Sequence, residues 1–147
     1  MNEDLCRKFV LHFNKKMNLE IGTASKHFQK WLSEQGIPLS LFRFLIWSWP
    51  QKDCEIGLCN ILSSESIHSH DATTTLLRFN LLNVGNAING DWIVIDFSNA
   101  ACAPGYIPFA LWNAYALEPA DPRGLLQPIS RSLDSCLYRL VEGLYLP

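Results

Sequence analysis

Two cysteines and two histidines lie near one another in the sequence and could supply metal chemistry. Cys54 and Cys59 form a C-x4-C pair, and His68 and His70 follow as an H-x-H pair across a polar stretch. Thiolate and imidazole groups suit zinc, which makes a small metal-dependent enzyme one hypothesis. The spacing matches no tight zinc template, however, and small buried cysteines with loop histidines account for the same residues. The sequence therefore favours a protein with no metal and no cofactor.

Asp91 and Asp96 are a second pair to consider, because paired carboxylates can act as general acid and base. They stand five residues apart in a segment with strand periodicity, which would place them on opposite faces of a strand. We therefore expect Asp91 to cap a turn and Asp96 to end a strand. The sequence also contains no Gly-x-Ser-x-Gly elbow and no phosphate-binding loop of the Gly-x-x-x-x-Gly-Lys type. These observations predict that the protein is not an enzyme.

Large aromatic residues in the predicted strands favour protein binding instead. One face of the sheet is predicted to display three aromatic and two charged side chains: Trp92, Tyr106, Trp112, Arg78 and Asp96. Aromatic residues among a few charges are typical of protein-binding hot spots. These residues are our candidate partner-binding site, which a homodimer would use equally well. The alternative is that the N-terminal helices or the segment 118–128 cover this face.

Helical periodicity opens and closes the chain and would frame the sheet. Apolar residues recur every three or four positions in four segments: 6–17, 25–36, 38–49 and 132–144. Ser25 is a suitable N-cap, and Pro38 suits a first helical turn. In the third segment, four residues are predicted to share the buried face: Leu41, Phe42, Leu45 and Ile46.

Between these helices the apolar period changes to two. Alternation predicts a short strand within 54–62 and three better strands: 77–82, 92–97 and 107–112. The polar stretches 63–75 and 118–128 are predicted to be loops. Asn89-Gly90 predicts a tight hairpin turn, since both residues tolerate positive φ angles. The whole pattern predicts one α+β domain over residues 1–147, with N-terminal helices, a central antiparallel sheet and a C-terminal helix packed on it.

The charge balance and the cysteines bound the class of protein further. Twelve Lys and Arg residues against fourteen Asp and Glu give a net charge of −2, which disfavours a strongly basic nucleic-acid-binding protein. The longest apolar-rich stretch, 39–49, is too short to span a bilayer, and the N-terminus lacks the pattern of a secretory signal. Five scattered cysteines are then expected to be reduced thiols. We predict a cytoplasmic protein that binds neither membranes nor nucleic acid.

Four segments in order resemble the SUKH superfamily, which includes fungal glucan-synthesis regulators and bacterial immunity proteins. Residues 37–45 (IPLSLFRFL) are similar to its Leu-Pro helix, and residues 83–96 (NVGNAINGDWIVID) to its central signature of Gly-Asp followed by a strand. Residues 105–109 (GYIPF) are similar to the next family strand, and the helix at 132–144 to the C-terminal one.

This resemblance implies a protein-binding module without catalysis, although a fold does not determine a function. The leading hypothesis is a module that works by stoichiometric binding, such as an immunity protein that neutralises a toxin domain. Two alternatives remain open. One is the small metal-dependent enzyme using the cysteine and histidine pairs, and the other is a structural or regulatory subunit of a complex.

Overall fold

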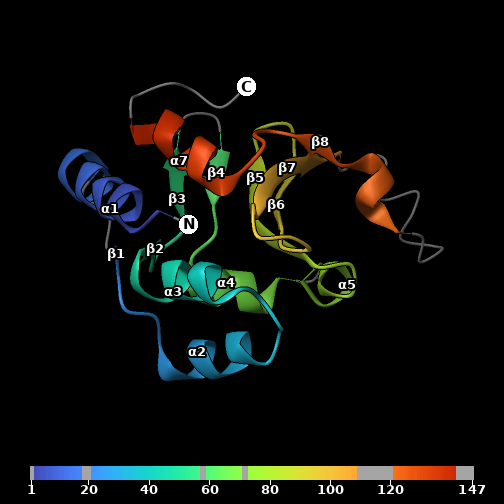
Figure 1. The fold of residues 1–147 in the computed structure, drawn as a ribbon, viewed down its shortest axis with the longest axis horizontal. Coiled ribbons are helices and arrows are strands. Elements are labelled where there is room, and N and C mark those ends of the chain that lie inside the picture. The colour runs from blue at the N-terminus through green and yellow to red at the C-terminus, as the bar shows by residue number, and fades with distance from the viewer. Residues whose placement is uncertain (1, 18–20, 57–58, 71–72, 109–120, 142–147) are drawn as a thin grey trace.

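Helices and one six-stranded antiparallel sheet make up the fold, which confirms the predicted α+β class (Figure 1). The structure is a computed structural model, and it describes residues 2–17, 21–56, 59–70, 73–108 and 121–141. The three predicted N-terminal helices are α1 (Glu3–Met17), α2 (Lys26–Ser33) and α3 (Leu39–Trp47). Ser25 begins α2 as expected, because its hydroxyl accepts a hydrogen bond of 3.2 Å from the backbone N–H of Phe28.

The sheet is a succession of antiparallel neighbours. Its strands, in spatial order, are β3 (Cys54–Ile56), β4 (Cys59–Ile61), β5 (Leu81–Ala87), β6 (Trp92–Asp96), β7 (Ala103–Ile107) and β8 (Gln127–Pro128). The turn between β5 and β6 contains Gly90 at φ +90°, which confirms the predicted hairpin. Asp91 lies in this turn and Asp96 ends β6, also as predicted. A separate pair, β1 (Ile21–Gly22) and β2 (Trp49–Pro50), joins the chain before α2 to the chain after α3.

Two segments differ from the sequence prediction. The polar stretch 63–75 is not a loop but carries two short helices, α4 (Ser64–Ser69) and α5 (Thr73–Leu77). Ser63 supplies the N-cap of α4, accepting a hydrogen bond of 3.2 Å from the backbone N–H of Ser66, which a count of apolar residues does not detect. The predicted strand at 77–82 is also wrong, because α5 continues to Leu77, and Asn80 then turns the chain at φ +58° before β5.

The two later strand and loop predictions also need correction. The strand expected at 107–112 instead runs from Ala103 to Ile107, and residues 109–120 lie outside the described residues. The predicted loop at 118–128 contains a short 3-10 helix, η1 (Pro122–Leu125), followed by edge strand β8. Pro128 has no N–H to donate, which an edge strand tolerates.

Apolar side chains bury themselves on both faces of the sheet. On one face, Ile93 and Ile95 of β6 join a large core with residues of α1, α2, α3, α4 and of the C-terminal helix α7 (Leu133–Val141). The participation of α7 confirms that the C-terminal helix packs on the sheet. On the other face, a smaller core contains Leu76, Leu81, Val94 and Ile107, with four further side chains packed against it: Phe79, Trp92, Leu125 and Leu126.

Helix α3 offers the sharpest mutational test of this packing. Leu45 is fully buried in the large core, so Leu45→Ala removes apolar contacts and leaves a cavity. We predict a loss of about 2–5 kcal/mol in the free energy of unfolding, measured by urea denaturation. Leu39→Ala is the matched control on the same helix, because Leu39 is exposed, and it should change stability by less than about 0.5 kcal/mol. Equal effects of the two substitutions would contradict the helix orientation.

Candidate protein-binding surface

The strand register separates the aromatic residues that were predicted to share one face. Trp92 pairs with Ile107 across β6 and β7, whereas Tyr106 pairs with Ile93. Cross-strand partners lie on the same face, so Trp92 and Tyr106 lie on opposite faces of the sheet. The predicted common surface is therefore wrong for Tyr106, and Trp112 lies outside the described residues. The error lies in the face assigned to the third predicted strand, because its pairing with β6 puts Ile107, and not Tyr106, on the face of Trp92.

Tyr106 belongs to the large core. It packs against that core, and its hydroxyl lies 4.0 Å from the Sγ of Cys59. Burial and the neighbouring Cys59 raise the pKa of Tyr106 to about 12. Burial, with a further contribution from Asp53, raises the pKa of the Cys54 thiol to about 11. These groups stay protonated at neutral pH, which makes the Cys54 thiol a poor nucleophile or metal ligand.

The face that carries Trp92 is covered. Leu76 of α5 and two leucines, Leu125 and Leu126, pack over Val94, and Trp92 itself is half-buried at the rim of this smaller core. The ring of His70 lies edge-on to Trp92, with centroids 5.8 Å apart. Coverage by the 118–128 segment was the alternative expectation, and its described part, from residue 121 on, does provide these two leucines.

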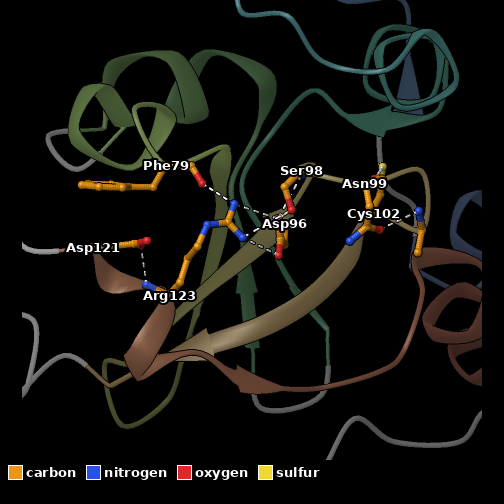
Figure 2. A network of polar contacts seen from close by, with 8 residues as sticks. Phe79, Asp96, Ser98, Asn99, Cys102, Asp121 and Arg123 are labelled. Atoms are coloured by element: carbon orange, nitrogen blue, oxygen red, sulfur yellow. Dashed lines mark hydrogen bonds and ion pairs between the residues drawn. The ribbon is translucent and has the colours of Figure 1, made fainter.

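Asp96 holds this cover in place. Figure 2 shows Arg123 of η1 reaching to the end of β6, where its guanidinium group meets the Asp96 carboxylate. The Arg123 Nη1 donates to Asp96 Oδ2 at 2.9 Å, and Nη2 donates to Asp96 Oδ1 at 3.1 Å. Nη2 also donates to the backbone carbonyl of Phe79, and Nη1 donates to the hydroxyl of Ser98 at 3.3 Å. One side chain thus joins η1, the end of β6 and the turn before β5.

The electrostatics of Asp96 suit this structural role. Burial opposes ionisation of the carboxyl group, but hydrogen bonds from Arg123 and Ser98 outweigh it, so the pKa of Asp96 lies below its ordinary value. A two-pronged Arg–carboxylate pair is strong and specific in geometry. Asp96 is therefore engaged inside the molecule instead of being presented to a partner. The sequence analysis did not identify Arg123. The one sequence signal near it is Asp121-Pro122, a pair typical of a helix start.

Arg78 is the remaining predicted contact residue. It follows α5 and is exposed, but it lines a hollow beside His68 instead of the sheet face. The structure therefore scatters the described residues of the predicted surface: Trp92 at the rim of the smaller core, Tyr106 in the large core, Asp96 in the clamp with Arg123, and Arg78 among the helices.

The four candidate metal ligands do not come together either. His68 lies on α4 and stacks on Trp31, with ring centroids 4.4 Å apart, and His70 follows the end of α4. Cys54 and Cys59 lie on the neighbouring strands β3 and β4. Within the described ranges, no three His, Cys, Asp or Glu groups are close enough to hold a metal ion.

Helix α3 carries the surface that the sequence prediction overlooked. Leu39, Arg43 and Trp47 are spaced by four residues, so they line up along one side of the helix. Leu39 is 61% exposed and Trp47 is 58% exposed, and Arg43 between them is exposed as well. The sequence contains the signal for this surface, because the buried stripe predicted for the same helix does not include these three positions.

A groove of about 480 Å³ runs between this stripe and α1. We call it the α1–α3 groove and define it by six lining residues: Cys6, Arg7, Leu39, Arg43, Phe44 and Trp47. Both charged residues that line it are arginines, and no acidic side chain among the described residues lines it. In the part of the chain that the structure describes, neither arginine forms an ion pair. The groove is thus apolar at its floor and positively charged at its walls.

Comparison with known proteins leaves the family undetermined. No family model matches the chain, and no curated protein shows significant similarity to it. None of the described helices combines the length and apolar character needed to cross a membrane.

The clamp between Arg123 and Asp96 predicts a defined pH dependence. Folding lowers the pKa of Asp96, so ionisation of this carboxyl group stabilises the folded protein. The stabilisation is fully present at pH values above the pKa of Asp96 in the unfolded chain, which is about 3.9. It disappears as the pH falls through the lower pKa of Asp96 in the folded protein. We expect Asp96→Asn to cost about 1.5–3 kcal/mol at pH 7, with the difference from wild type shrinking below about pH 4. Urea denaturation at several pH values measures both the cost at pH 7 and its change with pH.

Asp4→Asn is the matched control for this experiment. Among the described residues, the Asp4 carboxylate contacts Lys8 in an exposed ion pair of 3.5 Å on α1, and such pairs contribute little. Loss of this ion pair in Asp4→Asn should lower the free energy of unfolding by less than about 0.5 kcal/mol. A cost for Asp96→Asn no larger than this, or one that does not change with pH, would contradict the proposed role of the clamp.

Proposed function

We propose that the protein works by binding another protein, without catalysis, and that the α1–α3 groove is the contact surface. The observation that carries this proposal is the exposure of Trp47 and Leu39 along one side of a helix whose other side is buried. A large aromatic residue left in water costs solvation free energy, and contiguous exposed apolar groups commonly mark interaction sites. Trp and Arg are the residue types that dominate binding hot spots.

The packing behind the groove supports the proposal. Phe44 lies at the groove floor, with its ring 5.6 Å from that of Phe9 and 5.8 Å from that of Trp49. Phe9 and Trp49 are themselves buried. A floor anchored in the core keeps α1 and α3 at a constant distance, so the exposed stripe needs little ordering when a partner binds.

The charges of the groove specify what the partner presents. Arg7 and Arg43 flank the apolar floor, and no described acidic residue lines it. Complementarity therefore calls for an apolar side chain flanked by carboxylates on the partner. We propose that the protein binds such a partner stoichiometrically, as an immunity protein binds a toxin domain. The resemblance to the SUKH superfamily suggests this role. Membership of that superfamily and the toxin remain predictions.

A pair of matched variants tests the proposal. Immobilised wild-type protein, Trp47→Ala and Arg78→Ala are exposed to lysate of the native host, and the retained proteins are quantified by mass spectrometry. We predict a protein that wild type and Arg78→Ala retain equally and that Trp47→Ala retains at least tenfold less, since a hot-spot aromatic contributes about 2 kcal/mol or more. Retention should also fall with added salt, because the flanking charges are exposed.

The thermal midpoint separates loss of binding from loss of fold. Trp47 is exposed, so Trp47→Ala should melt close to wild type. If every retained protein binds Trp47→Ala as well as wild type, the groove is not the contact surface. If sedimentation shows a dimer of wild type that Trp47→Ala dissociates, the groove joins two copies of this chain, and the proposed foreign partner is wrong.

A further inference from the structure

A second hollow lies among the short helices, on a different set of residues from the α1–α3 groove. It measures about 440 Å³ and is formed where α2, α4 and α5 meet. The residues that line it with polar or aromatic side chains are Trp31, Gln35, His68, Thr73, Thr74 and Arg78. Its size falls within the range of small-molecule sites in proteins.

His68 is held in this hollow by its ring face. The imidazole stacks on Trp31 with centroids 4.4 Å apart and planes 28° apart, and the ring of His27 lies 5.1 Å away. Stacking occupies the face of a ring and leaves the nitrogens at its edge available for hydrogen bonds. His68 is half-buried, yet its side chain has no hydrogen-bond partner among the described residues. A preoriented polar group of this kind is ready to bind a ligand.

Arg78 adds positive charge to the same hollow. It is exposed in the turn after α5 and forms no ion pair with a residue that the structure describes. Thr74 contributes an exposed hydroxyl, and the hydroxyl of Thr73 donates to the carbonyl of Ile67 at 2.6 Å. No acidic side chain is found among the described residues that line the hollow. Arg78, His68 and Thr74 therefore give the hollow a lining rich in hydrogen-bond donors, which favours an anion.

We propose that this hollow binds a small phosphate ester. A phosphate monoester spreads up to two negative charges over three terminal oxygens, so it meets the positive charge of the guanidinium group more strongly than a singly charged carboxylate and accepts more hydrogen bonds from the imidazole and hydroxyl groups beside it. Arginine also matches phosphate geometry with two parallel hydrogen bonds. The apolar part of the ester rests against Trp31 and Leu77, which line the same hollow.

Titration with phenyl phosphate, followed by NMR of 15N-labelled protein, tests the proposal. We expect saturable binding that shifts the signals of α4, α5 and the Trp31 indole. Arg78→Ala should weaken the binding about tenfold or more, the loss expected for a charge-assisted hydrogen bond. Arg43→Ala removes the same charge from the α1–α3 groove and should leave the affinity unchanged, so it is the matched control.

Two further probes define the chemical class. Inorganic phosphate lacks the apolar part and benzoate lacks the phosphate, and each should bind several-fold more weakly than phenyl phosphate. Benzoate binding as tightly as phenyl phosphate would overturn the assignment to phosphate. Non-saturable shifts, or equal effects of Arg78→Ala and Arg43→Ala, would overturn the site itself. Thr74→Val, at an exposed position, gives a second variant that should weaken binding without altering the fold.

Discussion

The central strand β6 is apolar at three successive positions, Ile93, Val94 and Ile95, and all three are buried. Successive residues of a strand point to opposite faces, so neither face of this sheet can be left in water. Antiparallel sheets commonly keep one solvated face, but this one needs two covers. The amphipathic helices supply one of them. The smaller cover comes from α5 and from the segment around η1, which lie far apart in the sequence.

That second cover forms the smaller of the two cores, and polar contacts and close fit add to its apolar packing. Arg123 ties η1 to Asp96 at the end of β6 and to the turn before β5. Gly105 on β7 leaves the space that Leu126 fills, since a Cβ there would lie 2.7 Å from the Leu126 Cδ1 atom. Once this face is closed, the sheet has no open aromatic surface of the predicted kind among the described residues, and the large exposed side chains of α3 become the best candidates for binding.

The sequence predicts the elements whose local signals agree and fails where a distant contact decides. Ser25, Pro38 and Asn89-Gly90 each mark an element end by their own chemistry, and those predictions are confirmed. The segment 63–75 has few apolar residues, and α4 within it is supported by the Ser63 cap and by burial of Ile67 in the large core. The face of Tyr106 depends on the register in which β7 pairs with β6, and a shift of one residue moves every side chain of the strand to the other face. The partner of Asp96 lies 27 residues away, which no periodicity reveals.

Oxidative footprinting of the native protein measures the solvent exposure of individual tryptophans, with the modification of Trp47, Trp49 and Trp92 read by mass spectrometry. It tests whether the Trp92 face of the sheet is covered while the outer face of α3 is open to solvent. If this arrangement is correct, then of these three described tryptophans Trp47 should react fastest, Trp92 several-fold more slowly, and the buried Trp49 slowest. Modification of Trp92 as fast as that of Trp47 would contradict this arrangement, because it would mean that the sheet face is open to solvent and that the binding surface lies there.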